Sequence, residues 1–388
     1  MLIATVITRL EGGAGVHALR GALAMNSAAF QMTIITGSGG KLLGEATRAG
    51  LEVVIEPSLR SPIDPRHDLL AVHRLGSLFR QRGFDVAHTH TAKAGTVGRW
   101  AAHRAGIPRI VHTYHGFPFH EFQRAPRRRA YLAIERRLGR ITDLALCVGT
   151  GVAVDAVRRE LIAPERIRTI GVVVAGADEA GAGFPVAGAP GVAPLARRRA
   201  RLALGLPADA TVVGTVGRLT YQKAPEDFLA ALRRLGRPGV IGVWIGGGEL
   251  AEHVAGLAAA MPDVTVVLAG ERDDVPGLLP AFDVFALSSR YEGLPTVVVE
   301  AMVCGVPVVA TAVNAVADVV VPGETGLLVP PGRPELMAQA IGFMLDSPAA
   351  AARMATAART HLGARFGEQA LRRALTEAYT APPRPSRP

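Results

Sequence analysis

The chain has few cysteines and no long apolar run, and these absences exclude several classes of protein. Only two cysteines, Cys147 and Cys304, occur among the 388 residues, and they lie too far apart for metal-type spacing. This usage fits a reducing compartment and excludes a disulfide framework. No stretch reaches the roughly 18 uninterrupted apolar residues of a membrane span. The opening MLIATVITRLEGG lacks a cationic region and a cleavage signal, so we expect a cytoplasmic protein that does not cross a bilayer.

Acidic residues are in the minority, and the net charge of +10 admits nucleic acid, anionic lipid or a phosphorylated ligand as a partner. No helix-turn-helix, zinc-finger or RNA-binding signature is present, so we predict no binding to nucleic acid. The densest basic cluster is RAPRRRAYLAIERRLGR, where Arg127, Arg128 and Arg129 border an apolar stripe at helical spacing. Such a helix suits an anionic membrane surface, with an ordinary solvated helix as the equal alternative.

Short β-branched runs alternate with helical patterns along both halves of the chain, which predicts parallel sheets covered by helices on both faces. We therefore predict an α/β protein with two doubly wound, Rossmann-like domains facing each other across a cleft. The domains are placed at 1–171 and 206–365, joined by a Gly/Ala/Pro-rich linker region at 172–205. A C-terminal helix packing back toward the N-terminal domain, followed by a disordered tail, is assigned to 366–388. Ligands should bind at the carboxyl ends of the strands, facing the cleft.

Two stretches at predicted strand ends have residues that suit phosphate. The first strand runs into a glycine turn with Gly12 and Gly13, where the backbone and a helix N-terminus can approach an anion, although the pattern is not a complete dinucleotide-binding fingerprint. In TVGRLTYQK a later strand delivers Arg218 and Lys223. An arginine fork and a lysine point charge suit a diphosphate, and two solvated basic side chains are the plain alternative.

Histidines gather in the first half of the chain, where eight of the eleven fall between residues 67 and 120. His88 and His90 share one face of a strand, and His115 follows the next strand beside a glycine. A zinc site is conceivable, but no Cys, Asp or Glu completes a ligand set at matching spacing. We expect His115 to donate a hydrogen bond to a substrate hydroxyl or phosphate.

The stretch SSRYEGLPTVVVEAMVCGVPVVAT holds two carboxylates, Glu292 and Glu300, in an otherwise apolar run. Proline at 295 and glycine at 305 predict a short helix over residues 295–304. Glu292 then precedes the helix and Glu300 lies about two turns along it, with the helix N-terminus between them. Two acceptors flanking an anion site would suit a ligand with hydroxyl groups at both ends and phosphates in the middle, which is the layout of a nucleotide sugar.

With these motifs together, the chain resembles the retaining nucleotide-sugar glycosyltransferases of family 4, which have the two-domain GT-B fold. EGLPTVVVE followed by AMVCGVPVVAT is similar to the family's E-x7-E signature. VGRLTYQK, HTHTAKAGTVGRWAA, VHTYHGFPFH and GETGLLVPPG are similar to family segments in the expected order. HTHTAKAG with HTYHGFPFH resembles the bacterial branch that builds capsule, exopolysaccharide or O-antigen on lipid-linked acceptors.

The resemblance implies roles for individual residues. Arg218 and Lys223 would hold the donor diphosphate, helped by the amide of Gly13. Glu300 would bind the ribose hydroxyls and Glu292 a hydroxyl of the donor sugar. His115 would lie between donor sugar and acceptor. The whole predicted set consists of catalytic His115, Glu292, Arg218 and Lys223; donor-binding Gly12, Gly13, Gly247, Arg272, Gly293, Leu294, Pro295 and Glu300; and acceptor- or membrane-facing His88, His90, Lys93, Arg127, Arg128 and Arg129.

The same resemblance implies a UDP-sugar donor, no cofactor and no required metal, a closing motion between the domains, and a peripheral position on the inner face of the cell membrane. The chain departs from the family at IGVVVAGADEAG, where an Asn-Gly-Val-Asp run is common, and at AVNAVAD, where a glycine-glycine turn is common. The alternatives are an acceptor that is a soluble aminocyclitol or polyketide, a non-hydrolysing sugar-nucleotide epimerase, and a sugar-nucleotide binder without activity. A dehydrogenase would need a nicotinamide site that the sequence does not show.

Overall fold

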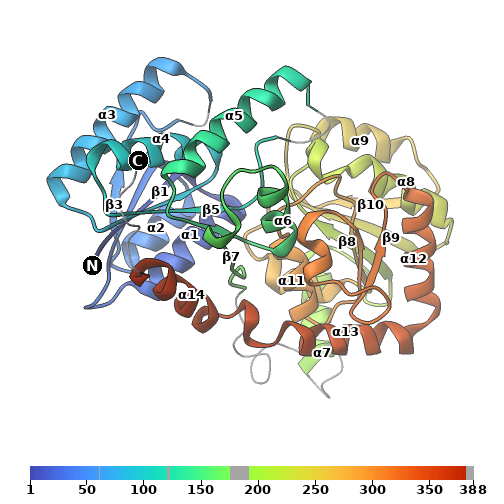
Figure 1. Ribbon diagram of the computed structural model, residues 1–388. Coiled ribbons are helices and arrows are strands. Elements are labelled where there is room, and N and C mark those ends of the chain that lie inside the picture. The colour runs from blue at the N-terminus through green and yellow to red at the C-terminus, as the bar shows by residue number, and fades with distance from the viewer. Residues whose placement is uncertain (61, 120–122, 175–191, 382–388) are drawn as a thin grey trace. The chain divides into compact units, whose positions relative to one another are not determined.

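The computed structural model describes residues 1–60, 62–119, 123–174 and 192–381 (Figure 1). The chain divides into two compact units, Met1–Val173 with Phe366–Pro388 and Val174–Arg365. Each unit holds one parallel sheet with helices on both faces, as the alternating pattern predicts. No helix within the described ranges is both long and apolar enough to span a bilayer.

Unit 1 is built on a seven-stranded parallel sheet in the order β3-β2-β1-β4-β5-β6-β7. Its strands are β1 (Leu2–Leu10), β2 (Gln31–Gly39), β3 (Glu52–Ile55), β4 (Val86–His90), β5 (Arg109–Tyr114), β6 (Leu144–Cys147) and β7 (Ile167–Thr169). Its helices are α1 (Gly12–Met25), α2 (Lys41–Arg48), α3 (Pro65–Arg82), α4 (Ala92–Ala105), α5 (Ala125–Ile141), α6 (Thr150–Arg158) and α14 (Glu368–Thr380). A short 3-10 turn, Pro164–Arg166, precedes β7.

Two apolar layers cover the sheet of unit 1. Side chains alternate along each strand, so that Ile3 and Ile7 of β1 pack against α1 and α14, while Ala4 and Val6 pack against α3 and α4. Leu371 and Leu375 place α14 directly on α1. The C-terminal helix is therefore part of unit 1, although α14 starts 356 residues after the start of α1 in the sequence.

Unit 2 has a six-stranded parallel sheet in the order β10-β9-β8-β11-β12-β13. Its strands are β8 (Thr211–Val216), β9 (Val240–Ile245), β10 (Thr265–Leu268), β11 (Val284–Leu287), β12 (Val308–Thr311) and β13 (Leu327–Val329). Its helices are α7 (Val192–Ala203), α8 (Pro225–Leu235), α9 (Ala251–Ala259), α10 (Val275–Leu278), α11 (Thr296–Val303), α12 (Pro334–Asp346) and α13 (Pro348–Leu362). Four 3-10 turns are Tyr221–Lys223, Leu279–Ala281, Asn314–Asp318 and Gly363–Phe366.

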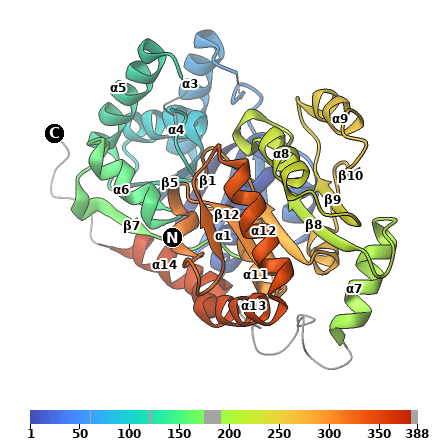
Figure 2. The same ribbon diagram turned by 90° about the vertical axis from the view of Figure 1, so that its right-hand side faces the viewer.

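Within unit 2, α8 and α12 lie side by side on one face of the sheet, and α11 lies on the other, where it contacts α13 (Figures 1 and 2). In both units the order of the strands reverses beside the first strand, between β1 and β4 and between β8 and β11. Ligands of open α/β sheets bind at the carboxyl ends of the strands at such a point. The candidate residues are expected at these two edges.

The predicted linker differs from the structure in its second half. Residues 192–203 form α7, which packs against Leu279–Ala281 of unit 2 and is tied to Asp283 by Arg197 and Arg201. An arginine-rich segment has good helix propensity and here has a carboxylate to pair with, so it joins the domain instead of linking it. Residues 175–191 of the predicted linker and the predicted disordered tail at 382–388 lie outside the described residues.

Candidate donor-binding site

The loop after β11 holds Glu292 in a network of donors. Its side chain is almost wholly buried, and Oε1 accepts hydrogen bonds from Lys223 Nζ at 2.5 Å and from Ser289 Oγ at 2.6 Å. Gln222 Nε2 donates to Oε2 at 3.3 Å. A buried carboxylate needs this compensation, since an unpaired one would cost several kcal/mol. Lys223 and Glu292, which the resemblance assigns to different parts of the donor, are thus paired with each other.

Arg218 lies at the end of β8 and its side chain is exposed. Its guanidinium has no ion pair or hydrogen bond within the described ranges, so it is available to an anion. The turn that carries it is held by the glycine loop after β9: Leu219 N donates to Gly247 O at 2.7 Å, and Gly217 N to Ile245 O at 2.9 Å. The predicted donor residue Gly247 therefore supports Arg218 through its carbonyl group.

The glycine loop after β9 is packed too closely for any other residue. Gly246 has φ +135°, and an added Cβ would lie 2.2 Å from Gly217 O. Gly248 has φ +150°, and its Cβ would lie 2.4 Å from Leu219 O. Both positions require glycine for backbone conformation and for space. The consequence is a rigid frame for the turn bearing Arg218.

Helix α11 begins one residue later than predicted, at Thr296, with Pro295 as its N-cap, and it is followed by Gly305 in the left-handed conformation expected there, with φ +71°. The amides of Gly293 and Leu294, just before the helix, donate to no acceptor in the described part of the chain. Free amides at a helix N-terminus favour an anion or an electron-rich hydroxyl group. They lie next to Glu292 in the sequence, as the nucleotide-sugar interpretation requires.

Glu300 lies on α11, half-buried among apolar side chains. Burial raises the pKa of its carboxyl group from 4.5 to about 7. No lysine, arginine or hydrogen-bond donor of the described residues compensates this carboxylate. A carboxylate placed where its charge is penalised and left without a partner is typical of a functional site. Its penalty is removed when hydroxyl groups of a ligand donate to it.

The remaining predicted donor residues to describe are Arg272, Gly12 and Gly13. Arg272 is exposed and forms a two-pronged ion pair with Asp274, with distances of 2.8 and 2.7 Å. Gly12 starts α1 with φ +63°, and Gly13 has open space where a Cβ would be. Gly13 is therefore not required by packing, and only a ligand approaching its amide would demand a glycine there.

Unit 1 gathers histidines at the carboxyl ends of β4 and β5. His90 Nδ1 and His115 Nε2 lie 3.0 Å apart, and the rings of His88 and His90 are tilted by 38° with centroids 4.2 Å apart. His17 of α1 lies against both His90 and His115, with centroids 6.2 and 5.2 Å away. Tyr379 of α14 completes the group through a 2.8 Å hydrogen bond between its hydroxyl and His88 Nδ1. We call these five residues the histidine cluster.

Burial and mutual repulsion keep the histidine cluster neutral. Desolvation lowers the pKa of His17 to about 4 and that of His88 to about 3, and it lowers those of His90 and His115 well below 6.5. No three His, Cys, Asp or Glu side chains within the described ranges are arranged to hold a metal ion. A neutral imidazole at position 115 can donate from one nitrogen and accept at the other, which suits contact with a sugar hydroxyl group.

Two sets of residues predicted for the acceptor side have contacts within the protein. Lys93 is paired with Asp68 and donates to Pro62 O at 2.9 Å, so it ties α4 to α3 and to the segment before it. On α5, Tyr131 and Leu132 pack against Phe119, Ala156 and Leu161.

The apolar stripe of α5 consequently faces protein. Leu138 is 3% exposed, Tyr131 and Leu132 are half-buried, and Ile134 is 44% exposed. The helix uses its apolar side to cover unit 1, as amphipathic helices of globular proteins do. Arg127 and Arg129 are exposed and Arg128 is half-buried, so the outer surface offers charge without an apolar face.

Below the helix, α5 is anchored by a buried ion pair that the sequence pattern does not reveal. Arg99 of α4 is wholly buried, and its Nη2 lies 2.8 Å from Glu135 Oε2 of α5. Tyr114, at the end of β5, donates to the same carboxylate oxygen at 3.1 Å. The strand that leads to His115 and the basic helix therefore share one polar anchor.

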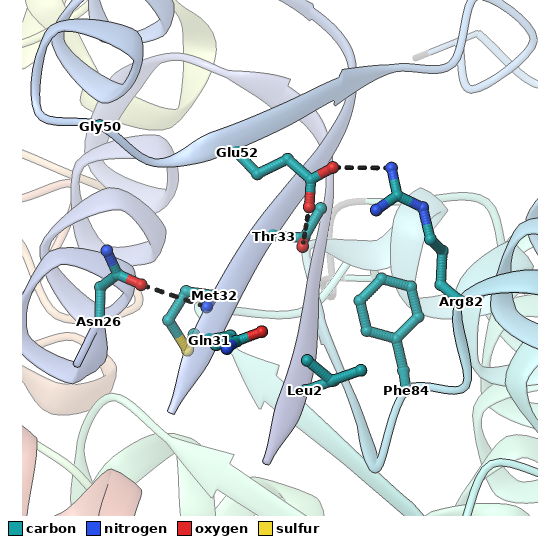
Figure 3. A pocket seen from close by; sticks show the side chains of 9 residues that line it. All are labelled: Leu2, Asn26, Gln31, Met32, Thr33, Gly50, Glu52, Arg82 and Phe84. Carbon is teal, nitrogen blue, oxygen red and sulfur yellow. Dashed lines mark hydrogen bonds and ion pairs between the residues drawn. The ribbon is translucent and has the colours of Figure 1, made fainter. Parts of the chain in front are cut away.

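A pocket of about 350 Å³ lies elsewhere in unit 1, at the amino ends of β1, β2 and β3 (Figure 3). Glu52 pairs there with Arg82 at 2.7 Å and accepts from Thr33 Oγ1 at 2.8 Å, while Asn26 Oδ1 accepts from Met32 N at 3.3 Å (Figure 3). Its charged groups are already satisfied by each other. The pocket also lies at the opposite edge of the sheet from the histidine cluster, so we assign no function to it.

Comparison with known proteins identifies two family segments. The model for glycosyl transferases group 1 matches residues 196–361, and that for glycosyltransferase family 4 matches residues 11–174. The UDP-Gal:alpha-D-GlcNAc-diphosphoundecaprenol alpha-1,3-galactosyltransferase of Escherichia coli is 29% identical over 74% of this chain and 72% of its own length. The D-inositol 3-phosphate glycosyltransferase of Saccharomonospora viridis is 32% identical over 78% of this chain and 71% of its own.

The fold is shared with solved structures. The crystal structure of Anabaena HepE in complex with UDP and glucose superimposes with a TM-score of 0.81, covering 98% of this chain and 100% of that chain at 21% identity. The predicted pair of Rossmann-like domains in the GT-B arrangement of sheets and helices is confirmed by this likeness.

Proposed function

Because the chain belongs to the family 4 glycosyltransferases, we propose that it moves a hexose or N-acetylhexosamine from a UDP-sugar to an acceptor hydroxyl group with retention of anomeric configuration. The observation that carries the donor assignment is the set of unused groups at one edge of unit 2. Among the residues that the structure describes, Arg218 has no counter-ion, the amides of Gly293 and Leu294 have no acceptor, and the carboxylate of Glu300, whose pKa is raised by burial, has no compensating donor. The Arg218 cation suits the diphosphate, the two amides suit the sugar, and the Glu300 carboxylate suits the ribose.

In this reaction the bond between the anomeric carbon and the diphosphate oxygen breaks, and a bond from that carbon to the acceptor oxygen forms on the same face. The acceptor proton passes to the departing diphosphate oxygen, so charge and atoms balance. Arg218, Lys223 and the helix amides stabilise the negative charge that develops on the diphosphate. These groups supply the charge that a metal ion would otherwise provide, and we propose that the enzyme needs no metal and no cofactor.

We assign two roles to Lys223. Its ammonium group donates to Glu292 Oε1 at 2.5 Å, which orients the buried carboxylate. Its ammonium group has three donors, of which Glu292 occupies one, so a second is left for a diphosphate oxygen. Glu292 in turn accepts from a hydroxyl group of the donor sugar.

The acceptor that we favour is a lipid-linked saccharide, in the assembly of capsule, exopolysaccharide or O-antigen at the inner face of the cell membrane. Two observations support it: the Escherichia coli relative acts on a GlcNAc-diphosphoundecaprenol, and α5 exposes Arg127 and Arg129. Because the apolar side of α5 is turned inward, the proposed attraction to anionic lipid is electrostatic and therefore sensitive to salt.

A soluble acceptor of the cyclitol or polyketide type is the second candidate, and the 32% identical D-inositol 3-phosphate glycosyltransferase favours its cyclitol form. The epimerase and binder alternatives differ in product, since an epimerase changes UDP-sugar without an acceptor and a binder releases no UDP. Mass spectrometry of purified protein with UDP-hexoses and either GlcNAc-diphosphoundecaprenol or inositol phosphate separates the two acceptors. Because epimers have the same mass, NMR spectroscopy of the recovered UDP-sugar separates an epimerase from a binder. We expect UDP release coupled to one hexose added to the lipid.

The membrane contact is tested with a matched pair of variants. Arg127→Glu with Arg129→Glu reverses two charges on α5, and Arg372→Glu with Arg373→Glu makes the same change on exposed positions of α14. We expect only the α5 variant to lose binding to vesicles containing phosphatidylglycerol and to lose activity on the lipid acceptor. Equal behaviour of the two variants, or equal binding of wild type to neutral vesicles, would exclude the proposed contact.

A further inference from the structure

Asn314, the first residue of the 3-10 turn after β12, has an unusual backbone conformation. Its φ is +44°, in the left-handed region, where non-glycine residues are uncommon. Asparagine tolerates this region better than most residues because its short polar side chain bonds locally. A glycine would adopt it without strain, so the presence of asparagine directs attention to what its side chain does.

The side chain of Asn314 holds the loop that contains Glu292. Glu292 N donates to Asn314 Oδ1 at 2.9 Å, across 22 residues of sequence. A backbone N–H can only donate, so the carboxamide oxygen must be the atom that faces it. The Nδ2 group then lies on the other side of the carboxamide, and it has no hydrogen-bond partner within the described ranges.

Ala315, the next residue, also bonds to this loop. Ala315 N donates to Gly293 O at 3.3 Å, so two successive residues of the 3-10 turn form hydrogen bonds with two successive residues of the Glu292 loop. The carboxylate of Glu292 is held separately by Lys223, Ser289 and Gln222, from the side of β8 and β11. The backbone of the loop is thus fixed from β12, and its side chain is fixed from β8 and β11.

These two hydrogen bonds use some backbone groups of the Glu292 loop and leave others unused. The bond to Asn314 uses the amide of Glu292, and the carbonyl of Gly293 is used by Ala315. The amides of Gly293 and Leu294 are left without acceptors. Fixing residues 292 and 293 therefore orients two unused donors and one carboxylate toward whatever occupies the space before α11.

We propose that Asn314 is a positioning residue for the donor sugar, acting through Glu292 and Gly293 and contributing little to recognition of the nucleotide. The proposal rests on the proposed glycosyltransferase function, because it assigns the Glu292 loop to the sugar. Loss of the side chain frees the loop while leaving Arg218, Lys223 and Glu300 in place, since none of these contacts Asn314. The sugar-dependent part of donor affinity should fall, and the part supplied by UDP should remain.

Asn314→Gly is the principal variant, because glycine keeps the left-handed backbone without strain and removes only the side chain that accepts from the Glu292 amide. Asn314→Asp is the conservative control, since aspartate tolerates this conformation and its carboxylate accepts the Glu292 amide. The first readout is hydrogen exchange of a peptide covering residues 288–296 without ligand. We expect exchange at Glu292 to be at least tenfold faster in Asn314→Gly than in wild type, and close to wild type in Asn314→Asp.

The second readout is calorimetric affinity for UDP and for the UDP-hexose that wild type binds. In Asn314→Gly we expect about a tenfold loss of UDP-hexose affinity, equivalent to about 1.4 kcal/mol, with UDP affinity within about twofold of wild type. A parallel loss for UDP and UDP-hexose, or an unchanged UDP-hexose affinity with accelerated exchange, would overturn the inference. If wild type binds UDP but no UDP-hexose, the proposed function itself fails, and the result is visible without the variant.

Discussion

Raising the pH from 6 to 8 should strengthen donor binding, because the pKa of Glu300 lies between these values. Burial raises that pKa from 4.5 to about 7, and no positive group of the described residues lowers it again. Ribose hydroxyl groups donate to the ionised carboxylate, so the ligand selects the deprotonated form. At pH 6 about one tenth of the protein has an ionised Glu300, and at pH 8 about nine tenths, which gives about a ninefold rise in affinity.

The assay is calorimetric titration with a UDP-sugar at pH 6, 7 and 8. UDP itself is unsuitable for this test, because its terminal phosphate titrates near neutral pH. The histidines of the cluster contribute little in this range, since burial lowers the pKa of His17 to about 4 and that of His88 to about 3, and lowers those of His90 and His115 well below 6.5. At pH 7, binding should release about half a proton, which titrations in buffers of different ionisation enthalpy measure directly.

Glu300→Gln provides the control, with nearly the same shape and no titration. Its affinity should be flat from pH 6 to 8 and lower than that of wild type at pH 8. The effect of pH on stability is opposite to its effect on binding. Because the carboxyl pKa is raised in the fold, the folded state binds more protons than the unfolded state between pH 4.5 and 7. Ionisation of Glu300 therefore lowers the stability of the fold. Glu300→Gln should therefore be at least as stable as wild type at pH 8. A flat wild-type profile, or the same slope in the variant, would refute the assignment of Glu300.

Further predictions concern the two units separately. Glu135→Gln leaves Arg99 buried without its counter-ion and should cost about 3 kcal/mol or more of unfolding free energy in denaturant titration; a cost below 1 kcal/mol would contradict the buried pair. For the histidine cluster, the folded pKa values of His17 and His88 lie below 6.5, so the unfolded state binds more protons and stability falls as pH drops below 6.5, by up to about 1.4 kcal/mol per pH unit for each histidine. His17→Phe should make the pH dependence of unfolding shallower by one proton, and an unchanged slope would show that His17 is protonated in the fold. Gly246→Ala should shift the turn bearing Arg218 and weaken UDP binding at least tenfold, measured by calorimetry, whereas Gly13→Ala should leave the melting temperature unchanged or slightly higher and lower only donor affinity.

Most strands were predictable because each is a compact β-branched run bounded by glycine or polar residues. β13 was not predicted, since a strand of three residues has no periodicity to detect. α7 was assigned to the linker because the Gly/Ala/Pro-rich composition before it was extended too far. The partner that makes this helix part of unit 2, Asp283, lies more than 80 residues away and leaves no local signal.

In the candidate site, sequence spacing placed Arg218, Glu292 and Glu300 at one sheet edge, because strand ends and helix starts are visible locally. What spacing could not show is which of these groups neutralise each other. The bond from Lys223 to Glu292 joins residues 69 apart in sequence. In the sequence, Asn314 is visible only as a departure from a common glycine turn, because its bond with the Glu292 amide joins residues 22 apart.

The same limit applies to unit 1. The sequence around His17 in α1 does not indicate that it contacts other histidines. Tyr379 lies 291 residues from His88, with which it forms a hydrogen bond. Helical periodicity cannot distinguish an apolar stripe that faces a membrane from one that faces its own domain. That distinction required the packing of Tyr131 and Leu132.

The most direct measurement of the central claim is calorimetric titration of UDP, GDP, ADP and their common hexose conjugates, in excess EDTA, with wild type and Arg218→Ala. We predict that UDP and one UDP-hexose bind to wild type at the same affinity with and without EDTA. Arg218→Ala, which loses an exposed side chain with no partner in the described fold, should keep its stability and lose most of this binding. If no nucleotide binds in EDTA, or if the variant binds as tightly as wild type, the donor site proposed for unit 2 is wrong.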